Sequence, residues 1–258
     1  GYALKRRTGL PWVADFRDLW TQNHAYPYSR FRRDRERGLE LRTMEKCRAM
    51  VTVSEPLRSR LGALHGKKTF VISGGFDPNT MILDGRTRHF TLTYTGNIYP
   101  QYDLGMLFRA LKELKLVRRR LEVRFYGTRQ PLIDQLAREH GVEDLIRQYG
   151  VISHEEALQR QRESHALLMF KWNGLETGVY SAKLWEYLAA MRPILAAGGR
   201  FDVVSRLLKE TKAGTCHEDM PSLTGKLLDL IDESERFGSP HYYGDERIVD
   251  VHVGRLRK

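Results

Sequence analysis

A lysine and a glutamate three residues apart follow a glycine-containing turn in the second half of the chain. The segment from Gly174 to Ala196 reads GLETGVYSAKLWEYLAAMRPILA, and Ser181 is a residue type favoured at a helix N-cap. Amide groups at a helix N-terminus bind anions such as a diphosphate, and Lys183 would add a positive charge there. Glu186 would lie about 4.5 Å further along the helix axis, where a carboxylate can accept both hydroxyl groups of a ribose. An ordinary surface ion pair between Lys183 and Glu186 fits the spacing equally well, so both interpretations stay open.

Short apolar runs alternate with amphipathic segments along most of the chain. The apolar runs predict strands at 10–16, 49–54, 69–75, 90–96, 121–127, 146–153, 165–170 and 192–199. Helical spacing between them predicts helices at 39–47, 55–64, 103–114, 131–141, 154–164, 181–191 and 202–211. Because a helix separates most successive strands, the pattern predicts an α/β fold with doubly wound parallel sheets.

A polar stretch at 77–88 interrupts this alternation, and we interpret it as the crossing between two domains. The expected domains are 1–78 and 79–236, followed by a C-terminal segment, 237–258, that packs back on the first domain. Three strands make a poor sheet alone, and the chain begins with Gly1 rather than methionine. We therefore expect the first domain to be incomplete, without its earliest strand and helix units.

In doubly wound sheets, ligands bind beyond the carboxyl ends of the strands, so the residues that follow the strands are candidates for chemistry. Asp15, Arg17 and Asp18 follow the first strand, where Arg17 could hold a phosphate or a sugar hydroxyl and Asp18 could orient it. A local ion network that caps the next helix is the alternative. Further along the chain, Gly74 and Gly75 would allow close backbone approach or a positive φ.

Three other residues have conventional structural interpretations. Ser54 precedes Pro56 and is expected to be a helix N-cap rather than a nucleophile. Trp20 is expected in the core, with sugar stacking as the alternative. His154 begins a helix after a strand and could reach the cleft, but we expect a capping or surface role for it.

The positive charge of the chain is concentrated in its first part. The net charge is +11, and residues 1–78 hold 16 basic and 8 acidic side chains. Such an excess attracts phosphates without identifying their carrier. The run SRFRRDRERG, from Ser29 to Gly38, fits a solvated helix face with i,i+4 ion pairs, or a patch that rests on an anionic membrane surface. No specific nucleic-acid binding is expected.

Composition excludes several classes of protein. With 41% apolar residues the chain can bury a core, and no apolar run approaches the roughly 20 residues that cross a bilayer. Cys47 and Cys216 are the two cysteines, so neither a disulfide framework nor a cysteine zinc site is predicted. The histidines are scattered and there is no Asp-X-Asp pair, so we expect no metal site. A cytoplasmic location fits these features, and so does a peripheral position at the inner face of the membrane.

The stretch EYLAAMRPILA, which begins at Glu186, resembles the donor-site signature of retaining GT-B glycosyltransferases of the family 4 type, which reads approximately EYLAAGRPILA. Supporting matches in family order are LPWVADFRDLWT, MVTVSEPLRSRL, VISGGFDPN, LTYTGNIY and VRFYG. They cover most of the chain, from Gly9 to about Gly199. The resemblance implies two Rossmann-like domains that face a cleft, with an acceptor-side domain at 1–78 and a nucleotide-sugar-binding domain at 79–236.

The activity implied by the resemblance is transfer of a sugar from a nucleotide diphosphate donor, of the UDP or GDP type, to an acceptor hydroxyl. The transfer would retain the anomeric configuration and need no metal or other cofactor, because the helix N-terminus and Lys183 would stabilise the leaving diphosphate. The acceptor would be a glycan or a lipid-linked molecule in polysaccharide or glycoconjugate synthesis. From their place after the first strand, we expect Asp15, Arg17 and Asp18 to be the catalytic residues. The implied donor-binding residues are Gly96, Asn97, Gly127, Arg129, Gly178, Val179, Tyr180, Ser181, Lys183 and Glu186.

The sequence departs from the family pattern in three places. Gly178 stands where the family has a glutamate eight positions before Glu186, and Asn97 and Gln101 stand where many relatives have an arginine and a lysine. Arg129 is the candidate replacement for those cations. The family's N-terminal glycine loop and histidine would precede residue 1, so this chain alone is not expected to turn over. A nucleotide-sugar epimerase and a non-catalytic protein that binds nucleotide sugars or anionic surfaces remain alternatives.

Overall fold

The computed structural model describes residues 1–23, 28–76, 87–117, 121–172 and 177–238. By its internal contacts the chain divides into two units. Among the described residues, unit 1 comprises residues 1–74 and 177–180, and unit 2 comprises the remainder. No described helix is both long enough and apolar enough to span a bilayer.

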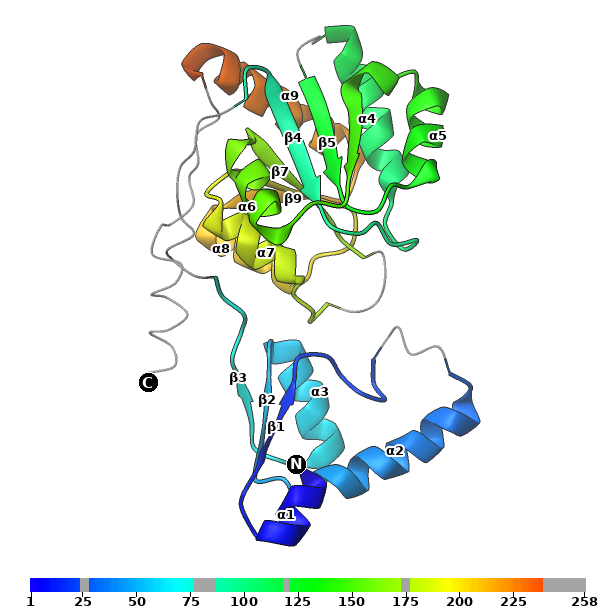
Figure 1. Cartoon of the computed structure of the whole chain (residues 1–258), viewed down its shortest axis with the longest axis vertical. Coiled ribbons are helices and arrows are strands. Elements are labelled where there is room, and N and C mark those ends of the chain that lie inside the picture. Colours follow the sequence, from blue (N-terminus) through cyan, green and yellow to red (C-terminus); the bar gives the residue numbers. More distant parts are fainter. Residues whose placement is uncertain (24–27, 77–86, 118–120, 173–176, 239–258) are drawn as a thin grey trace. The chain divides into compact units, whose positions relative to one another are not determined.

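Unit 1 is built on a parallel sheet of three strands in the order β1, β2, β3 (Figure 1). Its elements in chain order are α1 (Tyr2–Thr8), β1 (Val13–Phe16), α2 (Arg30–Met44), β2 (Ala49–Thr52), α3 (Glu55–His65) and β3 (Thr69–Val71). Apolar side chains from β1, β2 and α3 form its core, in which Met50, Leu57 and Leu61 are fully buried. The predicted succession of parallel strands and helices is confirmed for this part of the chain.

Helix α2 begins nine residues before the predicted start at residue 39. Ser29 caps it, because its hydroxyl accepts a hydrogen bond from the amide of Arg32. Arg32 in turn forms an i,i+4 ion pair with Glu36 at 3.1 Å. The arginine run therefore lies on an exposed helix, which is compatible with both sequence interpretations. Helix α1, which the sequence analysis did not predict, has no buried residue.

Unit 2 contains a six-stranded parallel sheet in the order β6, β5, β4, β7, β8, β9. The strands are β4 (Phe90–Thr95), β5 (Leu121–Tyr126), β6 (Ile146–Gly150), β7 (Ala166–Phe170), β8 (Ile194–Ala197) and β9 (Gly214–His217). Numbered within this unit, the order is 3-2-1-4-5-6, which is the arrangement of a Rossmann sheet. The central strands β4, β7 and β8 are buried along their whole length, as expected where helices cover both faces.

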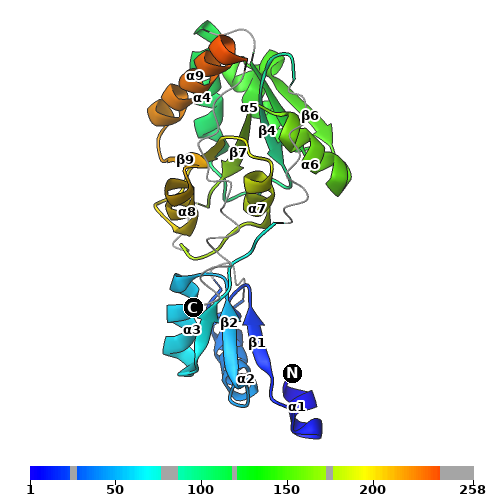
Figure 2. The same cartoon turned by 90° about the vertical axis from the view of Figure 1, so that its left-hand side faces the viewer.

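Helices lie on both faces of this sheet (Figures 1 and 2). They are α4 (Leu104–Val117), α5 (Pro131–His140), α6 (His154–Glu163), α7 (Ala182–Ala189), α8 (Val203–Thr211) and α9 (Met220–Phe237), together with the 3-10 turn Glu143–Leu145. Helix α4 packs against α5 and α9 on one face, and their apolar stripes join the sheet in one core cluster. Helices α6, α7 and α8 lie on the opposite face.

Several predicted elements have different bounds in the structure. The strands predicted at 69–75 and 146–153 are shorter in the structure, where they end at Val71 and Gly150. The residues that follow them, some of which are apolar, lie in loops. Strand β9 and helix α9 were not predicted, although α9 has clear start signals in Asp219, whose side chain caps the helix, and in Pro221. Ser54 caps α3, as expected. The C-terminal segment 239–258 lies outside the described residues.

Candidate functional site

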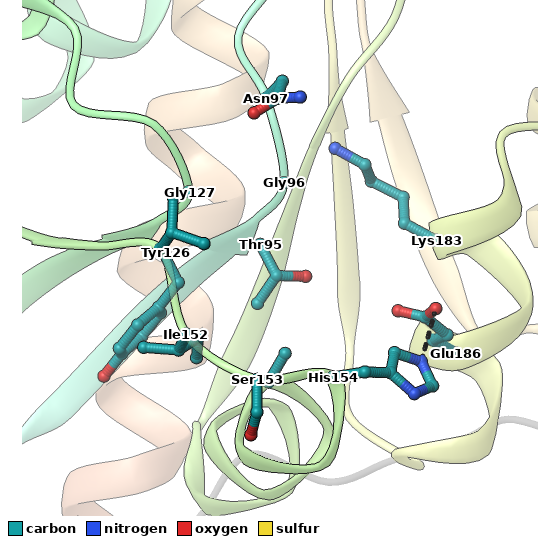
Figure 3. Close-up of a pocket in the computed structure, with 12 residues that line it drawn as sticks. Thr95, Gly96, Asn97, Tyr126, Gly127, Ile152, Ser153, His154, Lys183 and Glu186 are labelled. Atoms are coloured by element: carbon teal, nitrogen blue, oxygen red, sulfur yellow. Dashed lines mark hydrogen bonds and ion pairs between the residues drawn. The ribbon is translucent and has the colours of Figure 1, made fainter.

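A pocket of about 380 Å³ opens at the carboxyl ends of β4, β5 and β6 in unit 2 (Figure 3). Its lining comes from the ends of these strands, from the start of α6 and from α7, and comprises Thr95, Gly96, Asn97, Tyr126, Gly127, Val151, Ile152, Ser153, His154, Ala157, Lys183 and Glu186. The strand order of the sheet reverses between β4 and β7. Such a switch point is where open α/β sheets bind their ligands, so the topology and the pocket agree.

Two glycines allow the strand ends at this pocket to approach one another closely. The amide of Gly96 donates to the carbonyl of Tyr126 at 2.7 Å, and the amide of Gly127 donates to the carbonyl of Gly150 at 2.9 Å. A Cβ on Gly127 would lie 2.3 Å from the carbonyl oxygen of Gly96, and the φ of Gly127 is +148°. A side chain at Gly127 would therefore push apart the two loops that form one wall of the pocket.

Lys183, in the first turn of α7, points toward Gly96 and Asn97 (Figure 3). Its Nζ donates to the hydroxyl of Tyr94 at 2.6 Å, and the Tyr94 hydroxyl donates to the backbone carbonyl of Asn97 at 2.6 Å. Burial lowers the pKa of Lys183 to about 7, and the negative charge of Glu186 opposes that shift only in part. Lys183 is therefore a desolvated amine whose charged form is disfavoured by burial.

Glu186, one turn further along α7, has different partners from Lys183. Its Oε1 lies 3.1 Å from Nε2 of His154, and its Oε2 accepts a hydrogen bond from Nε2 of Gln161 at 3.2 Å. The side chain of Glu186 is 31% exposed, so the carboxylate can still accept hydrogen bonds from a ligand. In the described part of the chain no ion pair joins Lys183 to Glu186, so the surface-pair interpretation does not hold.

The structure brings together five of the predicted donor-site residues, which are Gly96, Asn97, Gly127, Lys183 and Glu186. Arg129 is exposed two residues beyond Gly127 and is not part of the pocket lining. Ser181 is the N-cap of α7, but its side chain makes no capping hydrogen bond. The predicted N-cap is thus correct in position and wrong in its side-chain contact.

Three further predicted donor-site residues, Gly178, Val179 and Tyr180, belong by their contacts to unit 1. The carbonyl of Gly178 accepts a hydrogen bond from the Ser54 hydroxyl at 2.5 Å. A Cβ on Gly178 would lie 2.9 Å from Cδ2 of Leu57, so this contact explains the glycine where the family has a glutamate. Val179 and Tyr180 pack against the core of unit 1.

The predicted catalytic residues Asp15, Arg17 and Asp18 lie in unit 1, in and just after β1, and their side chains are exposed. Among the described residues no ion pair links them to each other, so the local ion network is not observed. Gly74 ends unit 1 and Gly75 begins unit 2. Gly75 has no positive φ, and a Cβ there would meet open space, so its geometry does not require glycine.

Sequence reasoning did not identify three residues that build the site, namely Tyr94, Thr95 and Gln161, and it gave His154 a place at the cleft only as the second choice. His154 was expected at the surface, and its side chain is 72% exposed, but it also lines the pocket and contacts Glu186. Tyr94 and Thr95 end a buried strand, and the rule that ligands bind beyond strand ends could have included them. No local signal marks Gln161, which is buried on α6.

Among the described residues, no group of three or more His, Cys, Asp or Glu side chains could hold a metal ion.

No protein-family model and no curated protein matches the sequence.

The structure is similar to several solved structures. HepE of Anabaena, in complex with UDP, superposes with a TM-score of 0.71 at 11% identity, over 99% of this chain and 74% of HepE. Sucrose-phosphate synthase of Thermosynechococcus elongatus gives 0.68 at 12% identity, over 99% of this chain and 69% of the synthase. A glycosyltransferase of Rickettsia africae gives 0.70 at 14% identity, over 98% and 68% of the two chains. At identities this low, the structural similarity establishes the architecture alone. The chain therefore has the α/β GT-B fold of glycosyltransferases.

Proposed function

We propose that this chain binds a nucleoside diphosphate sugar in the pocket of unit 2 and is the donor-binding part of a glycosyltransferase, which transfers the sugar to an acceptor hydroxyl. The observation that carries the proposal is the arrangement of Lys183 and Glu186. They come from one helix, line one pocket at the switch point of the sheet, and have separate partners. One cation and one carboxylate, a helical turn apart, suit a ligand with an anionic part and a hydroxyl-rich part. Structures of HepE with UDP and with UDP-glucose support this choice of ligand.

Each part of the donor has a matching group in the pocket. Lys183 and the first-turn amides of α7 would bind the diphosphate and stabilise the negative charge that develops on it as the sugar leaves. The carboxylate of Glu186 would accept hydrogen bonds from the pentose hydroxyls. Gly96 leaves the space beside Nζ of Lys183 open, since a Cβ there would lie 3.1 Å from that nitrogen. We propose that this charge stabilisation needs no metal and that the transfer is retaining, as in the family that the sequence resembles.

The acceptor side of the reaction is assigned to unit 1 in this proposal. Asp15, Arg17 and Asp18 are exposed polar groups in and just after β1, and we propose that they contact the acceptor. The acceptor would be a glycan or a lipid-linked molecule in polysaccharide or glycoconjugate synthesis.

A thermal-shift panel tests the donor assignment. UDP, GDP and ADP, each with its sugar conjugates, are added to the chain at equal concentration, since a ligand that binds only the folded state raises its melting temperature. At 100 times its Kd a nucleotide adds about 2.7 kcal/mol, which is a shift of roughly 5–10 °C for a chain of this size. We expect one nucleotide series to give such a shift and the corresponding nucleoside monophosphate to give much less. No shift with any diphosphate would contradict the proposal, and analysis of the products separates transfer from epimerisation.

Helix α2 supports a membrane-bound acceptor. Arg30, Arg33 and Arg35 are exposed near its N-terminus, where the helix dipole disfavours positive charge, and no acidic residue lies in its first turn. Helix stability therefore does not account for these arginines. Phe31 lies among them and is 79% exposed, which is a combination typical of segments that rest on anionic membranes. We propose that this face of α2 docks on an anionic lipid surface.

Replacing Arg30, Arg33 and Arg35 together by glutamine should weaken sedimentation with vesicles of phosphatidylglycerol and phosphatidylcholine about tenfold at physiological ionic strength. The matched control replaces Arg138, Arg206 and Arg236, three exposed arginines of unit 2, which lowers the net charge equally. It should sediment like the unchanged chain, because these arginines do not lie on α2. Equal losses in both triple variants would show that the total charge, and not this helix, drives the association.

A further inference from the structure

The carboxylate of Glu186 is held in place by a buried side-chain amide from the neighbouring helix α6. Gln161 has no exposed surface, although it is the eighth residue of a helix whose other polar residues are all partly or fully exposed. Its Nε2 donates to Oε2 of Glu186 at 3.2 Å and to Oγ1 of Thr95 at 3.0 Å. Burying a glutamine amide is costly unless its groups are paired, so its presence here calls for a specific role.

The contacts of Gln161 permit one orientation of its amide group. Both hydrogens of Nε2 are used, while Oε1 is buried without a hydrogen-bond partner among the described residues. A flipped amide could accept a hydrogen bond from the Thr95 hydroxyl, but it would lose the contact with Glu186 and place its oxygen against the negative charge of that carboxylate. The side chain thus leaves one acceptor unpaired and keeps its donor on the carboxylate.

Thr95 connects this contact to the strand end and to α7. The backbone amide of Thr95 donates to the hydroxyl of Tyr187 at 3.0 Å, and its own hydroxyl donates to the same oxygen at 3.4 Å. Tyr187 is fully buried and follows Glu186 directly in α7. Gln161 therefore sets the position of the carboxylate relative to β4, α6 and α7, the elements that surround the pocket.

We propose that Gln161 is a positioning residue for the donor site, which fixes Oε2 of Glu186 so that the carboxylate accepts the pentose diol in one geometry. This inference rests on the proposed function, because the diol belongs to the nucleotide sugar. The other oxygen, Oε1, is contacted by His154, whose side chain is mostly exposed, so a ligand hydroxyl can replace the histidine there. Gln161 itself does not touch the ligand, since it is not part of the pocket lining.

Calorimetric titration with two ligands tests the role of Gln161. The ligands are UDP and 2′,3′-dideoxy-UDP, or the equivalent pair for whichever nucleotide the thermal-shift panel selects. Gln161→Leu should weaken UDP binding about tenfold, because a hydrogen bond to a charged group is lost, and should leave binding of the dideoxy analogue unchanged. In the background of Glu186→Ala, the same substitution should have no further effect on UDP.

Gln159→Leu is the matched control, since Gln159 lies on the same helix, is exposed and bonds to Glu163. It should bind both ligands like the unchanged chain. Gln161→Asn, whose amide is one methylene too short to reach, should resemble Gln161→Leu. An equal loss for both ligands, or additive losses with Glu186→Ala, would overturn the positioning role and indicate a general structural one.

A second measurement does not depend on nucleotide binding. In an amide-proton NMR spectrum, the side-chain NH₂ signals of Gln161, assigned by their loss in Gln161→Leu, should be protected from solvent exchange. Glu186→Ala should shift one of the two protons strongly, and the control Glu155→Ala on the exposed start of α6 should not. Unchanged signals in Glu186→Ala would overturn the inference whatever the nucleotide data show.

The outcomes separate this inference from the proposed function. If the Gln161 signals change in Glu186→Ala but no nucleotide binds, the contact is real and the proposed function is wrong. If the unchanged chain binds UDP and 2′,3′-dideoxy-UDP with equal affinity, then Glu186 does not bind the pentose diol, and the proposed diphosphate binding is unaffected.

Discussion

Lys183→Met is expected to weaken binding of the nucleotide sugar about 100-fold and, at the same time, to stabilise the free chain. The two effects have one cause, which is the burial of an amine whose pKa is lowered to about 7. Methionine retains the apolar stem of lysine and removes the charge that would meet the diphosphate. Calorimetry with the nucleotide sugar and thermal unfolding of the free chain measure the two effects separately.

The lowered pKa of Lys183 also predicts how the free energy of unfolding changes with pH. In the unfolded chain Lys183 titrates near its ordinary pKa of 10.5, so between about pH 7 and 10.5 the unfolded state binds more protons than the folded state. The free energy of unfolding of the unchanged chain should therefore rise with pH across this window, relative to Lys183→Met, by at most ~1.4 kcal/mol per pH unit. Below pH 7 the difference should be constant, with the methionine variant the more stable.

Ligand binding should reverse the protonation state of Lys183. At pH 8 the free amine is mostly neutral, and a bound diphosphate favours the ammonium form, so binding should take up nearly one proton. A nucleotide sugar is the ligand to use, because its diphosphate is esterified at both ends and does not itself titrate near neutral pH. Titrations in HEPES and in Tris buffer, neither of which adds a phosphate that would compete for the site, give the proton uptake from their difference in apparent enthalpy. Proton uptake that persists in Lys183→Met would contradict this assignment.

Glu186→Ala should weaken nucleotide binding about 50-fold, because the carboxylate would accept two hydrogen bonds from the pentose. At a ligand concentration of 100 times the original Kd, the stabilisation would fall from about 2.7 to about 0.65 kcal/mol. A thermal shift of several degrees would thus shrink to about a quarter of its size. Glu210→Ala, at an exposed glutamate of α8, is the control and should leave the shift unchanged.

Fragments of the ligand distinguish the two residues. Inorganic pyrophosphate should lose its binding in Lys183→Met and keep it in Glu186→Ala, since the carboxylate would touch only the pentose. The free nucleoside should show the opposite pattern. If Glu186→Ala leaves the shift with the full nucleotide intact, then the donor-site assignment is wrong.

The predicted elements that agree with the structure are those with strong local signals. Ser54 and Pro56 mark the start of α3, and the apolar run at 90–96 becomes the fully buried strand β4. The start of α2 was predicted nine residues too late, because the arginine run lacks the apolar spacing of a helix. The Ser29 cap and the ion pair of Arg32 with Glu36 stabilise this part of the helix. Gly178 was predicted at the donor site, but its surroundings come from Ser54 and Leu57, which lie more than 100 residues earlier in the chain.

The sequence by itself determined that Lys183 and Glu186 would share one helix after a buried strand, because helical spacing and apolar periodicity are properties of neighbouring residues. Only the tertiary structure decided their partners. Tyr94 reaches Lys183 from β4, and Gln161 and His154 reach Glu186 from α6, across separations of 25 to 89 residues. The physical reason is the crossover connection of a parallel sheet, which brings the carboxyl ends of distant strands to one edge without leaving a trace in local sequence.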